Sequence, residues 1–336
     1  MSNTILKELL KEYSQKRISS EKALDIKLQH LYSSNPRLKE INDEINLLSI
    51  SIAKLIITPN ELQKNNFEEK INLLKAEKAD ILTKLEISNS FFKPHYECIF
   101  CNDTGYVLDN NNSVMCTCLK QKIIDIEYNK SNINNLNKEN FDTFDENLYS
   151  DESDEKKYKT TLSPKKNILL IKNICETFVS DFDTFNEKNL LFTGNTGLGK
   201  TFLSNCIAKE LLSKGKTVLY QTSSVMLDTI IDYRFGKNNS SKDFYSNLLD
   251  VDLLIIDDLG TETPNSIKLT ELFNIINSRL LNQNKKPTKT IISTNLTLQN
   301  LFKNYDERLV SRFIGYYQIC RFFGDDIRFK KQIKKD

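Results

Sequence analysis

The residues best suited to chemistry form one run, Gly194-Asn195-Thr196-Gly197-Leu198-Gly199-Lys200-Thr201, which fits the pattern Gly-x-x-x-x-Gly-Lys-[Ser/Thr]. Glycines let such a loop curl so that its backbone N–H groups face a phosphate, and the start of the following helix adds partial positive charge. In this pattern Lys200 reaches the β- and γ-phosphates, and the hydroxyl of Thr201 ligates Mg²⁺. The run therefore predicts a site for ATP and Mg²⁺. The alternative is a glycine-rich turn that binds nothing.

Two carboxylates close an apolar run further along the chain. Residues 252–258 read Asp-Leu-Leu-Ile-Ile-Asp-Asp, as expected of a buried parallel strand that delivers acids at its carboxyl end. Ligands bind at that edge of open α/β sheets. Because neighbouring residues on a strand point in different directions, we assign Asp257 to the Mg²⁺ shell and Asp258 to orienting or deprotonating the attacking water. The alternative is that both acids only cap the turn into the next helix.

Strands and helices alternate around these residues. Short apolar runs predict strands at 190–193, 217–222, 252–257, 288–294 and 317–323. A helix is expected from Phe202 to Lys214, because Gly215 provides a C-terminal stop. This alternation indicates an α/β fold in which helices cover both faces of a parallel sheet.

Four of the seven cysteines lie close together in the sequence, and these are Cys98, Cys101, Cys116 and Cys118. A Cys-x-x-Cys turn, a short hairpin with a polar tip at residues 110–113 and a second cysteine pair are typical of a zinc ribbon or knuckle. Four thiolates complete a tetrahedral shell, so the predicted Zn²⁺ is structural rather than catalytic. The second pair is spaced by only one residue, which leaves His95 as an alternative ligand and four unrelated thiols as the alternative to a metal site. The other cysteines lie in apolar runs and are expected in the core, namely Cys175, Cys206 and Cys320.

The N-terminal part of the chain, residues 1–92, contains no glycine and is expected to form polar helices separated near Pro36 and Pro59. In the last of these predicted helices, from Glu61 to Ile87, apolar residues recur close to heptad spacing. A helical hairpin or bundle that packs on itself is the simplest interpretation. A coiled coil or a partner-binding surface is the alternative.

The composition is that of an ordinary soluble protein, with 336 residues, a net charge of +2, 27% charged residues and 39% hydrophobic residues. That length allows two or more domains. The sequence has no apolar run of the roughly 18 residues that predict a transmembrane helix and no apolar signal core. We therefore expect a cytoplasmic protein without a membrane partner. Because the net charge is close to zero, any nucleic-acid binding depends on local patches.

Changes in composition suggest four parts of the chain. They are a helical N-terminal region at 1–92, a four-cysteine zinc module at 93–128, a linker at 129–166 and an ATPase domain at 167–336. The linker is rich in asparagine, then in acids, then in lysine. Three of its aromatic residues, Phe141, Phe144 and Tyr149, are candidates for docking on the ATPase domain.

The order of these motifs resembles the AAA+ ATPases, in particular the bacterial replicative-helicase loader group (DnaC/DnaI type) and the related IstB transposition ATPases. The resemblance begins at the phosphate-binding loop and Asp257-Asp258 and continues downstream. Thr290-Ile-Ile-Ser-Thr-Asn295 resembles the sensor 1 strand, which implies that Asn295 watches the γ-phosphate and positions water. Glu307-Arg308-Leu-Val-Ser-Arg312-Phe resembles the arginine-finger segment and implies Arg312 as the finger. Gly324-Asp-Asp-Ile-Arg328 resembles sensor 2 and implies that Arg328 turns toward the nucleotide of its own subunit.

Two departures from the family pattern matter. The family usually has Asp-Glu where this chain has Asp257-Asp258, and the shorter carboxylate implies slow hydrolysis, which suits a switch better than a motor. The sequence ends eight residues after Arg328, which leaves little room for the usual helical lid. A neighbouring subunit or a partner is therefore expected to complete the nucleotide pocket. For Arg312, for its neighbour Arg308 and for Arg328, the alternative is a surface salt bridge.

The resemblance implies an ATP-dependent loader that places the replicative DNA helicase on DNA, binds single-stranded DNA and self-assembles through its ATPase domain. The cysteine module ahead of the ATPase domain favours this loader over an IstB-like transposition ATPase. A nucleotide-gated adaptor with negligible turnover is a third possibility. The full set of water-positioning and sensor residues argues against the adaptor.

Overall fold

The computed structural model describes residues 3–55, 61–127, 136, 138–185, 188–236, 241–263, 265–283 and 285–328. The chain divides into two compact units, one formed by Lys7–Val114 and the other by Met1–Leu6 together with Met115–Asp336. Within the described ranges, no helix is long and apolar enough to cross a membrane.

The unit Lys7–Val114 is built mainly from long helices, which are α1 (Asn3–Ser34), α2 (Pro36–Lys54) and α3 (Glu61–Lys84). The predicted break at Pro36 is present, and this proline begins α2, where its missing N–H leaves no helical bond unmade. The other predicted break, at Pro59, lies outside the described residues. The last helix ends three residues before the predicted Ile87, and Glu86 there has a φ of 54°.

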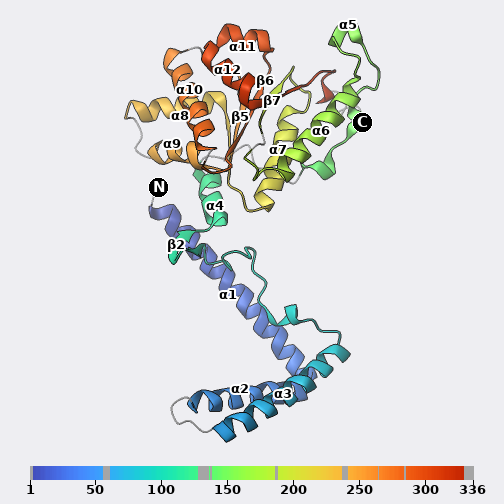
Figure 1. Ribbon diagram of the computed structural model, residues 1–336, viewed down its shortest axis with the longest axis vertical. Coiled ribbons are helices and arrows are strands. Elements are labelled where there is room, and N and C mark those ends of the chain that lie inside the picture. The colour runs from blue at the N-terminus through green and yellow to red at the C-terminus, as the bar shows by residue number, and fades with distance from the viewer. Residues whose placement is uncertain are drawn as a thin grey trace. The chain divides into compact units, whose positions relative to one another are not determined.

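Helices α2 and α3 pack side by side as the predicted hairpin (Figure 1). Leu38 and Ile41 of α2 are fully buried, and Ile71 and Leu74 of α3 are also buried. A short 3₁₀ helix, Asn89–Phe92, follows this pair. Apolar residues of the heptad-like pattern in α3 therefore pack against α2 within the same chain.

A small hairpin follows in the predicted cysteine module, with strands β1 (Tyr106–Asp109) and β2 (Asn112–Met115). The two residues at its tip, Asn110 and Asn111, both have positive φ, at 47° and 64°. Asparagine tolerates this left-handed conformation, which two-residue hairpin turns require. The predicted hairpin with a polar tip is therefore present.

The unit that contains Met115–Asp336 is built on a five-stranded parallel sheet in the order β4-β5-β6-β3-β7. Its strands are β3 (Asn189–Thr193), β4 (Val218–Thr222), β5 (Leu253–Leu259), β6 (Lys289–Thr294) and β7 (Tyr317–Arg321). All five predicted strands are present, with ends shifted by at most two residues from the predicted ones. The α/β parallel sheet expected from the sequence is therefore confirmed.

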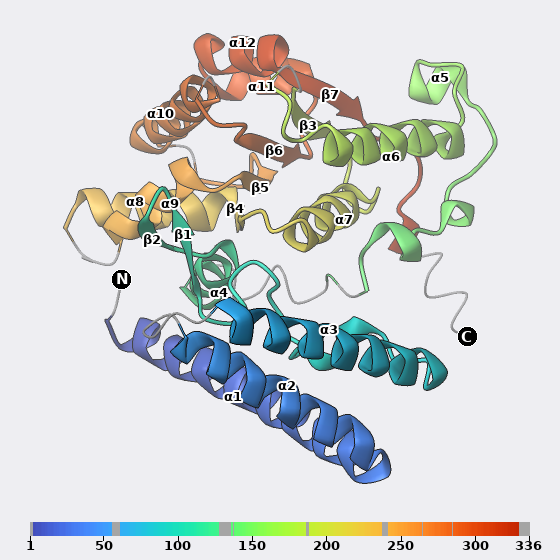
Figure 2. The same ribbon diagram turned by 60° about the horizontal axis from the view of Figure 1, so that its bottom comes forward.

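Helices cover both faces of this sheet, as Figure 2 shows. Leu190 and Phe192 of β3 belong to one apolar cluster, whereas Leu191 belongs to the other, because successive side chains on a strand point to opposite faces. On one face lie α6 (Pro164–Ser180) and α7 (Lys200–Ser213). The opposite face is covered by α8 (Ser223–Arg234), α9 (Ser241–Asp250), α10 (Ser266–Asn282), α11 (Leu298–Asn304) and α12 (Glu307–Tyr316).

Part of the segment predicted as a linker packs against the apolar cluster of α6 and α7, whereas residues 151–157 are exposed. It contains the 3₁₀ helices Phe141–Thr143 and Glu146–Leu148 and the short helix α5 (Glu155–Tyr158). Tyr149 is buried in the cluster of α6 and α7, and Phe141 and Phe144 pack against that cluster, so the expected docking of these aromatics is present. The three cysteines expected in the core, Cys175, Cys206 and Cys320, are buried there as well.

The side chain of Gln121, on helix α4 (Thr117–Glu127), hydrogen-bonds to the edge strand β4. The Gln121 amide accepts a bond from the Val218 N–H at 2.7 Å and donates to the Val218 carbonyl oxygen at 2.9 Å. Gln121 thereby pairs with β4 as a neighbouring strand would, and it satisfies backbone groups at the sheet edge.

Candidate nucleotide-binding site

The predicted phosphate-binding loop connects the end of β3 to the start of α7, as expected. Gly194, Gly197 and Gly199 have φ values of 144°, 72° and 93°, a range that strains any residue with a Cβ atom. A Cβ atom on Gly194 would lie 2.3 Å from the Phe322 carbonyl oxygen, and one on Gly197 would lie 2.0 Å from the Asp326 carboxylate. Both the conformation and the close packing of the loop therefore require glycine.

Lys200 lies buried beneath this loop. Its ammonium group donates to the carbonyl oxygens of Gly194 at 2.5 Å and Asn195 at 2.7 Å, and to Oδ1 of Asn295 at 2.8 Å. These acceptors are neutral. Burial lowers the pKa of Lys200 to about 8, and the nearby Asp258 and Asp257 carboxylates limit the fall. The ammonium is therefore a buried charge that an anionic ligand would stabilise.

Asp257 is buried at the carboxyl end of β5, next to the start of α7. Its Oδ2 atom accepts bonds from the Thr201 hydroxyl at 3.1 Å and the Tyr220 hydroxyl at 2.6 Å. Its Oδ1 atom accepts a bond from the Ser293 hydroxyl. A hydroxyl and a carboxylate oxygen so placed are the donor set that holds Mg²⁺ beside a phosphate-binding loop. The residues present therefore fit the predicted magnesium site.

Asp258 differs from Asp257 because the backbone changes direction between them. The pairing of β5 with β6 shifts register between Ile256 and Leu259, and Asp258 has a φ of 55°. This irregularity turns the Asp258 side chain into the cavity, where burial and then the Asp257 charge raise its pKa. The two acids are separated as predicted, but a left-handed residue does this rather than simple strand alternation.

The loop faces a cavity of about 520 Å³. The predicted site residues that line it are Thr196, Gly197, Leu198, Gly199, Lys200, Thr201, Asp258, Asn295 and Arg328. Asn295, the residue predicted as sensor 1, follows β6 directly and its side-chain oxygen accepts a bond from Lys200. Arg328 lines the same cavity. The expectation that the chain has little room for a helical lid concerns residues 329–336, which lie outside the described residues.

Gly194, Asn195 and Asp257 are not in the described lining of this cavity, and Arg312 lies on a separate helix. Arg312 occupies the middle of α12, and it is not among the described residues that line the nucleotide cavity. Its Nε atom donates to Asn277 Oδ1 at 2.9 Å. Arg308, one turn earlier, is exposed and forms a two-point ion pair with Asp306. The alternative of a surface salt bridge therefore describes Arg308 and does not describe Arg312.

Two residues near the phosphate-binding loop were not singled out as site residues in the sequence. The Tyr149 hydroxyl donates to the Leu198 carbonyl oxygen at 3.2 Å, and a Cβ atom on Gly199 would lie 2.5 Å from that hydroxyl. Glu139 lines the cavity and accepts a bond from the Asn205 amide at 2.6 Å. Both precede the loop by about fifty residues or more, so only the aromatic content of the segment gave a signal.

Glu262 is another carboxylate close to Asp258 in the sequence, but its side chain is buried and hydrogen-bonded within the core. Its Oε2 atom accepts bonds from the Ser223 hydroxyl at 2.6 Å and the Gly260 N–H at 2.9 Å, and its Oε1 atom accepts one from the Tyr305 hydroxyl. It does not belong to the described lining of the nucleotide cavity. This geometry favours Asp258 as the base.

The four cysteines of the predicted zinc module come together, and their sulfur atoms all lie within 4.8 Å of one another. Zn–S bonds of about 2.3 Å in a tetrahedron are compatible with such a cluster. His95 does not belong to this group of described residues. The thiols present therefore fit a four-cysteine zinc site.

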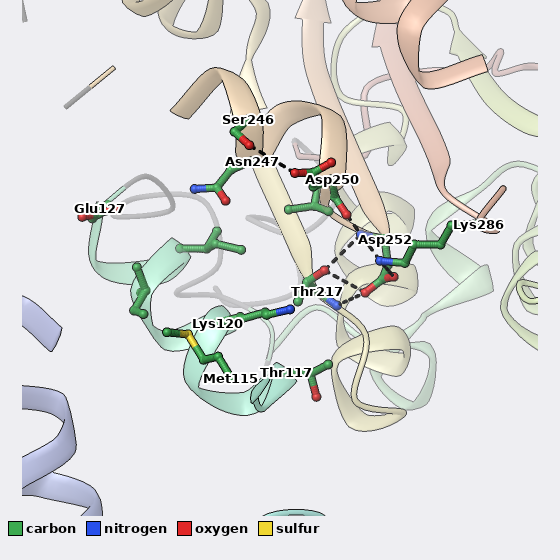
Figure 3. A pocket seen from close by; sticks show the side chains of 13 residues that line it. Met115, Thr117, Lys120, Glu127, Thr217, Ser246, Asn247, Asp250, Asp252 and Lys286 are labelled. Carbon is green, nitrogen blue, oxygen red and sulfur yellow. Dashed lines mark hydrogen bonds and ion pairs between the residues drawn. The ribbon is translucent and has the colours of Figure 1, made fainter. Parts of the chain in front are cut away.

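A second cavity, of about 330 Å³, lies at the amino-terminal end of the strands, beside α4 and α9 (Figure 3). Asp252 forms one wall, where it pairs with Lys286 at 2.7 Å and accepts bonds from the Thr217 N–H and hydroxyl. None of the predicted site residues lines this cavity. The residues predicted to bind nucleotide therefore lie at the cavity beside the phosphate-binding loop and not at this one.

Comparisons with known proteins agree with this geometry. A family model described as the bacterial DnaA ATPase domain matches residues 172–318. The replicative helicase loader DnaC of Escherichia coli (strain K12) is 30% identical over 135 residues, which are 40% of this chain and 53% of that loader. The chromosomal replication initiator protein DnaA of Wolinella succinogenes is 37% identical over 125 residues, which are 37% of this chain and 27% of that initiator.

Among solved structures, the crystal structure of the DnaC helicase loader aligns with a TM-score of 0.44 and 20% identity, covering 56% of this chain and 99% of that chain. The chain spans about half the length of the curated loaders that it matches. The matched residues include the phosphate-binding loop, both aspartates and Asn295. This chain is therefore related, through its ATPase segment, to the AAA+ ATPases of the DnaC-type replicative-helicase loader group.

Proposed function

We propose that this protein is an ATP-dependent loader of the replicative DNA helicase. The observation that carries the proposal is the arrangement of Lys200, Asn295, Asp257 and Thr201 around one loop, within a segment similar to DnaC loaders. Lys200 contacts the β- and γ-phosphates of ATP. Thr201 and Asp257 hold Mg²⁺, which when bound neutralises charge on the phosphate oxygens.

Hydrolysis in this proposal is slow and uses Asp258 to orient or deprotonate the attacking water. Asn295 positions that water, and Arg328 contacts the nucleotide of its own subunit. Support comes from the place of all three residues on the cavity wall and from the raised pKa of Asp258, which makes its carboxylate a better proton acceptor. The short Asp258 side chain limits the rate, so ATP acts as a switch.

The pocket is completed by Arg312 of a neighbouring copy of the chain. Support comes from two facts about α12. Arg312 lies away from the cavity of its own subunit, and no carboxylate among the described residues pairs with it, whereas Asp306 neutralises Arg308. An arginine supplied in trans stabilises charge in the transition state. Self-assembly through the ATPase domain is therefore part of the mechanism.

Single-stranded DNA binds near the carboxyl edge of the sheet. Support comes from a third cavity of about 570 Å³, which borders the phosphate-binding loop and is lined by Lys157, Lys159 and Arg321. The rings of Tyr158 and Phe323 in its wall lie 5.0 Å apart. Cations that contact a DNA backbone and aromatic faces that stack on bases are the usual parts of such a site.

The remaining parts of the chain follow the division expected from the sequence. Residues 1–92 form the helical region, 93–128 a zinc module held by Cys98, Cys101, Cys116 and Cys118, 129–166 a connecting segment and 167–336 the ATPase domain. Either of the first two parts supplies the contact with the helicase. Support for the metal is the close grouping of the four thiols.

The proposal is tested by mixing the purified chain with the replicative helicase of the same organism and, in parallel, with a transposase from that organism. We expect a complex with the helicase that forms with Mg·ATP, and transfer of the helicase to circular single-stranded DNA. Lys200→Ala is the matched control, because it removes the charged phosphate contact. Binding to the transposase alone would support the IstB-like alternative, and binding without any turnover would support the adaptor.

A further inference from the structure

Arg312 is held in place within its own subunit by contacts from three directions. Its Nε atom donates to Asn277 Oδ1 at 2.9 Å, and its Nη1 atom donates to the Arg308 carbonyl oxygen at 2.9 Å. The guanidinium carbon lies 4.5 Å from the centre of the Phe273 ring. Phe273 and Asn277 lie one turn apart on α10. A partly exposed arginine would otherwise sample many rotamers.

These contacts fix the side chain without cancelling its charge. The acceptors are an amide oxygen and a backbone carbonyl oxygen, both neutral, and the ring offers the negative face that attracts a cation. A guanidinium has five N–H donors, so two bonds leave others available. Arg308 also lies over the Phe273 ring, at 5.1 Å, but its charge is paired with Asp306. Of the two arginines, Arg312 is the one that remains able to bind a phosphate.

We propose that Phe273 and Asn277 are positioning residues, which hold the Arg312 guanidinium in the conformation in which it is supplied to the nucleotide of a neighbouring copy. This inference rests on the proposed role of Arg312 in trans. Phe273 supports one face of the guanidinium, and Asn277 sets its direction through Nε. Neither residue touches the nucleotide.

The test separates the copy that supplies Arg312 from the copy that supplies the pocket. Asp258→Asn protein retains Arg312 but has an inactive pocket, whereas Arg312→Ala protein has an active pocket but no arginine. Their mixture should recover activity. Adding Phe273→Ala to the Asp258→Asn protein should reduce the recovered rate roughly 10-fold to 100-fold, as a misplaced catalytic group does. Adding Phe273→Ala to the Arg312→Ala protein should leave the recovered rate unchanged.

This asymmetry distinguishes positioning from a merely structural role, because damage to the fold would reduce the rate in both mixtures. Equal losses in the two mixtures overturn the inference, and so does the absence of any loss. Phe273→Tyr keeps the ring and should restore the rate. If the parent mixture of Asp258→Asn and Arg312→Ala recovers nothing, the shared site itself is wrong, and the inference is overturned together with that part of the proposed function.

A second readout needs no turnover. In the wild-type chain without nucleotide, the Arg312 Nε–H NMR signal should be protected from exchange and shifted by the Phe273 ring. Asn277→Ala should remove that protection. Asn277→Asp should retain the contact but neutralise the charge, so the signal stays protected while activity in trans is lost. An unprotected Arg312 signal in the wild-type chain would show that the side chain is not held and would overturn the inference.

Discussion

The affinity for Mg·ATP should fall as the pH rises above about 8, because Lys200 loses its proton there. The ammonium is buried among neutral oxygen atoms, and burial lowers its pKa to about 8 from the ordinary value of 10.5. Below pH 8 the lysine already carries the charge that the phosphates need. Above pH 8 a growing fraction of the free protein must take up a proton when ATP binds, and this requirement weakens binding.

The magnitude follows from the fraction of charged lysine. At pH 9, one unit above the pKa, about one molecule in eleven carries the charged form, so the apparent dissociation constant should rise roughly tenfold over its value near pH 7. Calorimetric titrations with Mg·ATP between pH 7.5 and 9.5, in buffers with different ionisation enthalpies, measure both affinity and proton uptake. At pH 9 close to one proton should be taken up for each ATP bound.

Two variants connect this effect to Lys200. Lys200→Ala should bind weakly, with little dependence on pH across this range. Asn295→Asp places a carboxylate at the atom that now lies 2.8 Å from the ammonium, so it should raise the pKa of Lys200 and move the loss of affinity to higher pH. If the wild-type chain binds equally well at pH 7.5 and 9.5 without proton uptake, the assignment of Lys200 to the phosphates is wrong.

Three further predictions concern the base, the metal and α4. Asp258→Asn should retain ATP binding and lose at least about 100-fold in turnover. The control Glu262→Gln should retain turnover if it folds. The reverse result would reject the assignment of Asp258 as the base. Metal analysis of reduced protein purified without chelator should find about one zinc per chain, and Cys98→Ser should lose it while His95→Ala keeps it. Gln121→Leu should lower the free energy of unfolding by about 1–3 kcal/mol in denaturant titrations, because Val218 loses both side-chain bonds, whereas an equally stable variant would show that this pairing contributes nothing.

The strands and the phosphate-binding loop could be predicted from sequence because their signals are local. Apolar runs bounded by glycine and polar residues mark β3 and β5, and the glycines at 194, 197 and 199 are required by backbone conformation at those positions. The strand order is different, because it depends on which strands pair across long sequence separations. No local pattern states that β3 lies between β6 and β7.

The parts of the site that sequence analysis missed are those made by distant segments. Tyr149 reaches the loop from the segment ahead of the ATPase core, and its hydroxyl meets a carbonyl oxygen there. The irregularity at Asp258 arises where β5 pairs with β6, and a strand read by itself does not reveal it. Contacts of this kind depend on tertiary packing. A sequence motif therefore identifies the chemical groups of a site more readily than the residues from distant segments that surround it.

Arg279 and Arg312 show why the surroundings of a charged residue decide its role. Arg279 is almost fully buried, and its guanidinium donates to the Thr290 hydroxyl and to backbone carbonyl oxygens. Burial lowers its pKa to about 10. Those bonds join the segment before β5 to the start of β6, so its donors are used inside the fold. Arg312, on a neighbouring helix, makes two bonds to neutral acceptors and keeps other donors available. In the sequence both are arginines among apolar helical residues, and only the bonds that each makes within the fold distinguish Arg279, a structural residue, from Arg312, for which we propose a role in trans.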